Sequence, residues 1–137
     1  MPWRRSLVRL ADHQVEEIRK RLKAILDRCD VATVALAALH AEAEAESRHV
    51  GTDPEAGLAR LSYLNGWRAR RDAKKAEIAA LHAEEAGARE ALAEAFEALK
   101  KYEQVAESAR AASVKAAARR ETAVLDELGA QRAAAGR

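Results

Sequence analysis

The side chains best suited to bind a metal or to take part in catalysis are the four histidines and the single cysteine, Cys29. His13 begins the run His-Gln-Val-Glu-Glu, which lacks the second histidine, four residues on, of the zinc-binding helix motif. His40 and His82 come near each other if the chain folds into a hairpin, but two histidines make an incomplete metal site. Cys29 falls on an apolar stripe, where a cysteine is typically a small core residue. We therefore expect no metal site.

Patterns typical of enzyme active sites are missing from the chain. The sequence contains neither a phosphate-binding glycine loop nor the Gly-x-Ser-x-Gly turn of serine hydrolases. Many of its glutamates stand three or four residues from a lysine or arginine, which is the spacing of ion pairs on a helix surface. A two-helix fold also offers no concave pocket for a substrate. We predict no catalytic and no cofactor-binding residues, and no enzymatic activity.

The composition indicates which elements carry these side chains. Charged residues make up 34% and apolar residues 49% of the 137-residue chain, but aromatic residues make up only 4%. An alphabet dominated by alanine, glutamate, leucine, lysine and arginine is typical of long helices and coiled coils. Such a chain buries a narrow seam along a helix rather than a thick globular core. We predict an all-α fold with a single domain over residues 1–137.

A heptad pattern runs without interruption from Val8 to Val50 and predicts a first helix over about residues 4–50. Its seam positions alternate by three and four residues, and only Glu46 among them is polar, which is the signature of a coiled coil. At 1.5 Å per residue the pattern spans roughly 65 Å. The seam consists of Val8, Ala11, Val15, Ile18, Leu22, Ile25, Cys29, Ala32, Leu36, Leu39, Ala43, Glu46 and Val50.

Residues 51–66, rich in glycine and containing Pro54, are predicted to form the tip of a hairpin, in which Asp53 can cap a short helical piece that begins at Pro54. A second heptad frame follows and predicts a second helix over about residues 67–128, with Gly129 marking its end. The predicted fold is two long helices that form an antiparallel coiled-coil hairpin, with the second helix longer. The second seam consists of Leu64, Trp67, Arg71, Lys74, Ile78, Leu81, Glu85, Ala88, Leu92, Ala95, Leu99, Tyr102, Ala106 and Ala109.

The charged seam residues suggest how the two helices pair. Setting Glu46 opposite Arg71 pairs residues whose numbers sum to 117, so that Val50 faces Trp67. This register sets large apolar residues against each other along most of the seam. Residues 110–128 then extend beyond the first helix.

Charge is distributed unevenly along the chain, although the net charge is only +2. Residues 1–28 carry a net charge of +4 and residues 110–137 of +3, whereas residues 42–107 carry −4. A hairpin brings the two basic ends together, which suits docking of that end into an acidic protein cavity. The alternative is that basic ends only increase solubility. The residues we predict to make the docking contact are Arg4, Arg5, Arg9, Arg119 and Arg120.

Tyr63, Leu64 and Trp67 lie at the predicted tip, where a two-helix seam cannot cover all three, so they are candidate partner-binding residues. Trp67 also begins the basic run 67–75, in which an aromatic residue beside cations could serve nucleic-acid binding. The surrounding surface is acidic, and two of the cations are seam positions. We interpret the run as a solvated helix face and expect no nucleic-acid partner.

The compartment can also be inferred from the sequence. One cysteine excludes an intramolecular disulfide, and no stretch reaches the ~18 apolar residues of a membrane span. The N-terminal residues lack the apolar region of a secretory signal. We expect a cytoplasmic protein with no direct membrane insertion.

The layout and several motifs resemble the flagellar export protein family FliJ. The resemblance in layout covers the whole chain, and the readable motifs lie in its second half. These motifs are Phe96, Lys100-Lys101-Tyr102-Glu103, Arg119-Arg120-Glu121 and Leu125-Asp126-Glu127-Leu128.

The resemblance implies a role in protein export. Members of this family look like the central stalk of a rotary ATPase, with the open end of the hairpin inserted into a hexameric export ATPase. Toward the tip they contact the cytoplasmic domain of the export gate, and they escort export chaperones. The resemblance places such a protein peripherally at the cytoplasmic side of the membrane, but the sequence has no recognisable equivalent of the family's gate-contacting face. Position and charge alone make Arg4, Arg5, Arg9, Arg119 and Arg120 our candidates for the ring contact. Place at the tip alone makes Tyr63, Leu64 and Trp67 our candidates for the gate contact. A generic coiled-coil scaffold or dimerisation module is the alternative.

Overall fold

The structure is a computed structural model that describes residues 2–49 and 54–136. Within these ranges the chain forms two helices, α1 (Pro2–Ser47) and α2 (Pro54–Ala135), and no strand. Helix α1 has 46 residues and α2 has 82. The predicted all-α fold with a longer second helix is confirmed.

The helix bounds differ from the predicted ones mainly at the tip and at the C-terminal end. Helix α2 already begins at Pro54, where the sequence indicated a short helical piece, and it continues without a break through the whole of residues 54–66. Asp53, the expected cap, lies outside the described residues. Proline suits the first helical position, and the carboxylate of Glu55 in the first turn interacts favourably with the helix dipole. Gly129 does not end α2, because one glycine among strong helix formers costs only about 1 kcal/mol.

Helix α1 ends three residues before the predicted position. The amides of Arg48 and His49 bond to carbonyls three residues back, at 3.2 and 3.1 Å, which is the tightened last turn of a helix. The Ser47 hydroxyl also donates to the Glu44 carbonyl at 2.6 Å. Val50, the last predicted seam residue, lies outside the described residues.

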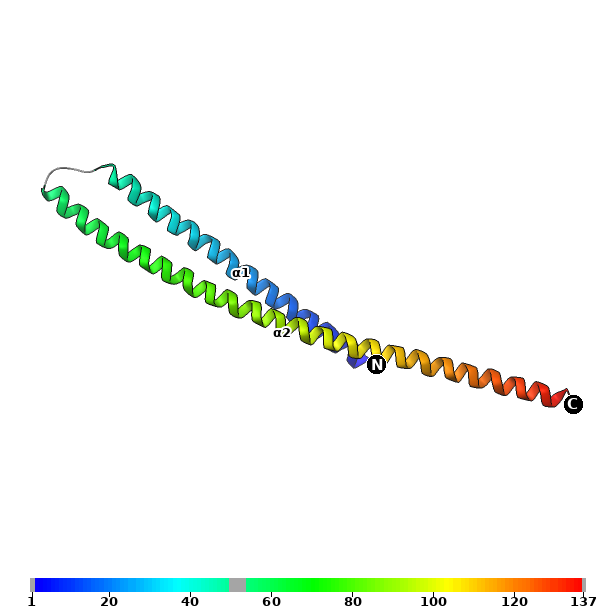
Figure 1. The fold of residues 1–137 in the computed structure, drawn as a ribbon. Helices are drawn as coiled ribbons and strands as arrows, with labels where there is room; N and C mark the ends of the chain where they lie inside the picture. Colours follow the sequence, from blue (N-terminus) through cyan, green and yellow to red (C-terminus); the bar gives the residue numbers. More distant parts are fainter. Residues whose placement is uncertain (1, 50–53, 137) are drawn as a thin grey trace. The chain divides into compact units, whose positions relative to one another are not determined.

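The chain divides into two compact units. In the unit of residues 16–93, α1 and α2 run side by side in opposite directions, seen as the cyan-to-blue and green ribbons of Figure 1. The other unit contains residues up to Val15 together with residues 94–137. In that unit every described residue from 110 to 136 is exposed. The antiparallel hairpin thus positions the candidate sites of the first unit. In the second unit, the N-terminal part of α1 carries Arg4, Arg5 and Arg9, and the exposed part of α2 carries Arg119 and Arg120.

The predicted seams are the buried faces of the helices. All eight buried apolar residues of the described chain belong to these seams. The other described seam residues are partly buried, except Glu46 and Tyr102, which are exposed. Alanines and other small residues hold much of the seam, so the helices pack through a narrow core. The buried residues are Ala11, Val15, Ile25, Cys29, Ala32, Trp67, Leu81 and Ala88.

The predicted register, however, is wrong. The indole N–H of Trp67 donates to the backbone carbonyl of Leu39 at 2.7 Å. In the register of sum 117, Trp67 would lie opposite position 50, which is 11 residues or roughly 16 Å farther along α1. Two ion pairs between the helices give the observed register. Arg28–Glu84 at 3.2 Å and Arg70–Glu42 at 3.4 Å both join residues whose numbers sum to 112.

The ion-pair sum of 112 differs from 117 by five residues, and the seam-to-seam pairing nearest to it has a sum of 110, which sets Leu36 opposite Lys74 and lies one heptad from the predicted register. A slip of a heptad leaves the same residues in both seams, so the apolar pattern alone cannot separate the two pairings. The ion pair between Glu46 and Arg71 that motivated the prediction is not formed, since Arg71 pairs with Asp72 at 3.0 Å. An exposed ion pair contributes only about 0–1 kcal/mol, which is less than burial of Trp67 with its N–H satisfied.

Candidate functional site

A groove with a volume of about 800 Å³ lies in the unit that contains residues up to Val15 and residues 94–137. Val8, Ala106 and Val114 supply apolar surface to it. Its charged lining consists of Arg4, Arg5, Arg9, Glu103, Glu107 and Arg110. The structure thus brings together the three N-terminal arginines that the sequence singled out.

Two of the charged groups in this groove are tied to each other. Arg110 donates to both carboxylate oxygens of Glu107, at 2.9 and 3.2 Å. These hydrogen bonds lower the pKa of the Glu107 carboxyl and raise the pKa of the Arg110 guanidinium. The guanidinium of Arg4 lies 4.9 Å from the centre of the Trp3 ring, a cation–π distance. The whole unit carries eleven Lys/Arg against eight Asp/Glu, a net charge of +3.

Arg119 and Arg120 lie on the exposed part of α2 in the same unit, outside the groove lining. The Nε of Arg120 donates to the Ala116 carbonyl at 3.4 Å. All five predicted docking arginines therefore belong to one unit. The antiparallel layout derived from the heptads was sufficient to group them.

An apolar face on the same exposed segment was not singled out from the sequence. Val114, Leu125 and Leu128 are exposed, and spacings of 11 and 14 residues, about three and four turns, place them on one face of α2. Exposed apolar side chains in a row mark an interaction surface. These positions lie off the continued heptad frame, which holds Ser113 and Arg120, so the signal in the sequence was the helical spacing of the large apolar residues themselves.

The three candidate residues at the tip are less accessible than expected. Trp67 is 9% exposed and anchors the hairpin, and its ring stacks edge-on against His40 with 5.6 Å between ring centroids. Tyr63 and Leu64 are half-buried. Burial, followed by the negative charges of Glu42 and Glu46, raises the pKa of the Tyr63 hydroxyl. Trp67 is thus a packing residue, and at most part of Tyr63 and Leu64 is presented to solvent.

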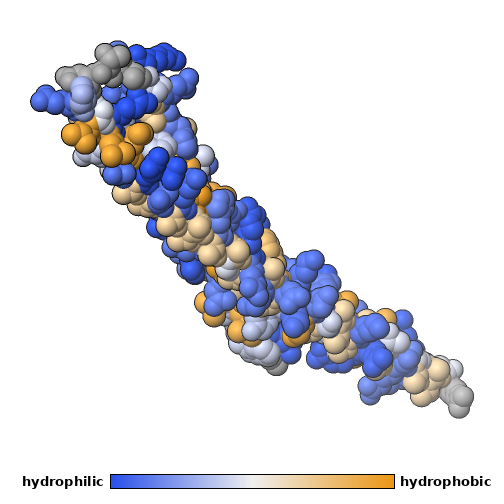
Figure 2. All heavy atoms as spheres, turned by 60° about the vertical axis from the view of Figure 1, so that its left-hand side comes forward, coloured by the Kyte–Doolittle hydropathy of each residue, from blue (hydrophilic) through white to orange (hydrophobic). Residues whose placement is uncertain are grey.

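Leu58 and Leu61 are the exposed apolar residues of this end, at 70% and 54%. Figure 2 shows hydrophobic surface gathered beside the grey atoms at the upper end of the view. The sequence analysis did not single out Leu58 and Leu61, because it followed the apolar face of the second helix only from Leu64 onward. Once this segment is helical, their spacing of three residues places them on one face.

The cations in the basic run 67–75 are largely paired with carboxylates. Arg70 reaches Glu42 across the hairpin at 3.4 Å, and Lys74 reaches Glu77 at 2.8 Å. The guanidinium of Arg71 lies 5.2 Å from the centre of the Trp67 ring. Since Trp67 is the single aromatic residue of this run and is buried, the run offers no accessible ring for base stacking.

The predicted proximity of His40 and His82 is wrong, because it depended on the register of sum 117. In the observed register, position 40 lies opposite position 72, ten residues or roughly 15 Å from His82. His82 instead lies near Glu85, with 3.6 Å between its Nδ1 and a carboxylate oxygen. No helix in the described part of the chain is long and apolar enough to cross a membrane.

These features define a coiled-coil hairpin protein whose exposed surfaces are suited to contacts with other proteins. Among known families, the model of the Flagellar FliJ protein matches residues 5–137. The chain is 45% identical over 134 residues to the Flagellar FliJ protein of two Caulobacter vibrioides strains, which covers 98% of this chain and 96% of each relative. The chain therefore belongs to the flagellar FliJ family, as the resemblance in its second half indicated. No solved structure matches it.

Proposed function

We propose that this chain is a stalk component of flagellar protein export that inserts one end into a hexameric export ATPase and lacks catalytic activity of its own. Membership of the FliJ family supports the flagellar setting. The observation that carries the stalk role is the exposed helical segment of residues 110–136, which lies in a unit of net charge +3. A long cationic helix with unburied apolar residues fits insertion into a ring lined by acidic residues.

Five arginines make the ring contact in this proposal. Arg4, Arg5 and Arg9 act from the groove, and Arg119 and Arg120 act from the exposed part of α2. Because all are at the surface or partly so, their charges steer the approach to the ring and set its dependence on salt. In this proposal export chaperones would bind the apolar face formed by Val114, Leu125 and Leu128.

Co-purification with the export ATPase and stimulation of its hydrolysis test the ring contact. We expect Arg119→Glu with Arg120→Glu to reduce stimulation at least tenfold. The matched control is Arg68→Glu with Lys75→Glu, which makes the same change in net charge on exposed residues of the other unit. If the control variant reduced stimulation as strongly, or the test variant left it intact, the proposed docking end would be wrong.

The second contact in this proposal is with the cytoplasmic domain of the export gate, and it involves the end of the hairpin beside the tip. Leu58 and Leu61 supply exposed apolar surface there, next to the half-buried Tyr63 and Leu64. Alanine at positions 58 and 61 is expected to weaken binding to the purified gate domain. The matched control is alanine at Val31 and Val34, which are comparably exposed on α1. Equal binding by both double variants would argue against this contact.

A homodimeric scaffold is the second candidate function. The apolar face of residues 114–128 favours it, because a second copy of the chain could cover that face as a coiled coil. Sedimentation equilibrium separates the two functions. A monomer at micromolar concentration supports the stalk, whereas a stable dimer lost on Leu125→Glu supports the scaffold.

A further inference from the structure

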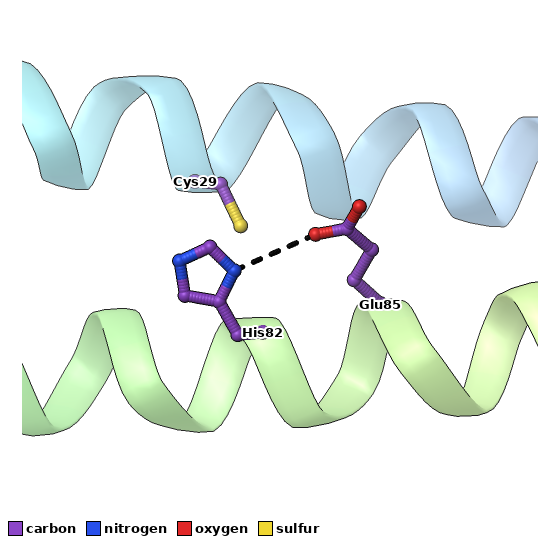
Figure 3. Close-up of side chains that lie close together, drawn as sticks. All are labelled: Cys29, His82 and Glu85. Atoms are coloured by element: carbon purple, nitrogen blue, oxygen red, sulfur yellow. Dashed lines mark ion pairs between the residues drawn. The ribbon is translucent and has the colours of Figure 1, made fainter.

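Three side chains that commonly bind metal ions come together in the hairpin unit of residues 16–93. Cys29 belongs to α1, and His82 and Glu85 belong to α2 at a spacing of three residues. One ligand atom from each (sulfur, imidazole nitrogen and carboxylate oxygen) lies within 4.8 Å of the other two. This is the only such group of three found among the described residues. Figure 3 shows the Cys29 thiol directed across the helix interface toward His82 and Glu85.

The distances suit a small tetrahedral metal ion. Bond lengths of Zn²⁺ to sulfur, nitrogen and oxygen imply separations of about 3.4–3.6 Å between ligand atoms at a tetrahedral ion. The Nδ1 of His82 and Oε2 of Glu85 already lie 3.6 Å apart. The imidazole of His82 has 64% of its side-chain surface exposed, so it can move the remaining ångström without repacking the core.

The two oxygens of Glu85 have separate partners. Arg89 donates from Nε and Nη2 to Oε1 at 3.0 and 2.9 Å, whereas His82 faces Oε2. Glu85 can therefore bind an ion through Oε2 while Arg89 continues to hold Oε1. Support of a ligand by a hydrogen bond to its second atom is the usual outer layer of protein metal sites.

The position of Glu85 is otherwise difficult to explain by packing. It occupies a seam position, where the heptad pattern normally places an apolar residue, and only 19% of its side-chain surface is exposed. A partly buried carboxylate beside a buried thiol is unfavourable unless it has a cationic partner. Arg89 supplies one such partner at Oε1, and a metal ion would supply the other at Oε2.

We propose that Cys29, His82 and Glu85 form a zinc site that links α1 to α2. Sulfur, imidazole and carboxylate together favour Zn²⁺ over Mg²⁺ or Ca²⁺, which prefer oxygen ligands alone. Binding releases the thiol proton of Cys29 to solvent, and His82 binds through the lone pair of its neutral ring. Three protein ligands leave the fourth position to water.

In the absence of a cation, the surroundings of the thiol oppose loss of its proton. Burial, followed by the charges of Glu85 and Asp30, raises the pKa of the Cys29 thiol, while Arg28 lowers it. The same carboxylates that disfavour a thiolate attract a divalent cation. A bound ion would connect the helices at mid-hairpin and fix their register, a role independent of the export proposal.

Cobalt binding tests the site directly, because a thiolate bound to Co²⁺ gives a charge-transfer band. The full chain, stripped with a chelator, is titrated with Co²⁺ and then back-titrated with Zn²⁺. We expect one Co²⁺ per monomer, a thiolate band that Zn²⁺ removes, and a rise in melting temperature with Zn²⁺. Absence of the band, or one ion shared by two chains, would overturn the proposal.

Variants separate the designed site from adventitious binding. His82→Ala changes an exposed residue and is expected to weaken Co²⁺ binding at least tenfold and to abolish the rise in melting temperature. The matched control, His49→Ala, removes another exposed histidine of the same unit and is expected to bind as the parent does. Equal affinity of the two variants contradicts the proposal. Cys29→Ser, similar in size, is expected to remove the band while the circular dichroism stays helical.

Discussion

Replacing Trp67 by alanine is expected to destabilise the hairpin more than any other single aromatic replacement. The side chain is 9% exposed, its N–H bonds to the Leu39 carbonyl at 2.7 Å, and its ring contacts His40 and Arg71. Truncation of a buried tryptophan typically costs about 3–5 kcal/mol. Phenylalanine keeps most of the apolar surface but loses the hydrogen bond, which is worth about 0.5–1.5 kcal/mol. The expected order is therefore wild type, Trp67→Phe, then Trp67→Ala.

Urea unfolding followed by far-ultraviolet circular dichroism measures these free energies. A Trp3→Phe background leaves Trp67 as the only tryptophan, so its fluorescence reports on the tip alone. Trp3, half exposed, is the control, and Trp3→Ala is expected to change the free energy of unfolding by less than about 1 kcal/mol. A loss below about 1 kcal/mol for Trp67→Ala would falsify the assignment of Trp67 as the anchor of the tip.

Three further predictions concern the hairpin. Gly87→Ala, with open space around the added methyl group, is expected to raise the free energy of unfolding in urea by about 0.5–1 kcal/mol; a decrease contradicts the observed helix packing. Arg89→Ala removes the hydrogen bonds to Oε1 of the metal-binding carboxylate and is expected to weaken cobalt binding about tenfold; unchanged affinity refutes its supporting role. In a cysteine-free background, Leu36→Cys with Lys74→Cys is expected to crosslink faster with a short bifunctional maleimide than Leu36→Cys with Leu81→Cys; the reverse order supports the register of sum 117.

The fold was predictable because it depends on which face of each helix is apolar. The heptads identified every buried residue, from Ala11 to Ala88. The register of the two helices was not predictable, because a slip of one heptad keeps the same apolar face on each helix. The deciding interactions were the hydrogen bond of Trp67 and the ion pairs of Arg28 and Arg70, which depend on three-dimensional reach. Gly and Pro at 51–66 indicated a tip with only a short helical piece from Pro54, but α2 covers this segment from Pro54 onward.

The candidate sites likewise divide into one that depends only on the topology of the hairpin and one that depends on its register. The grouping of Arg4, Arg5 and Arg9 with the C-terminal arginines required only an antiparallel topology. The Cys29, His82 and Glu85 group required the correct register, since the predicted one set Cys29 opposite Ala88. A search for cysteine, histidine and carboxylate on facing seam positions and the positions beside them, repeated for each heptad slip, would have found it.

The exposed end of α2 has a consequence for how a partner would bind it. An isolated helix in water must first form a nucleus, which is unfavourable by a factor of about a thousand. Residues 110–135 continue a helix that is already formed upstream, so they only elongate it, a step that is favourable by up to roughly 0.3 kcal/mol per residue. The paired part of α2 therefore supplies the helical turns from which these residues extend. A partner would bind a segment that is already helical, although its last turns fray easily. Binding there therefore loses little chain entropy and needs no separate folding step.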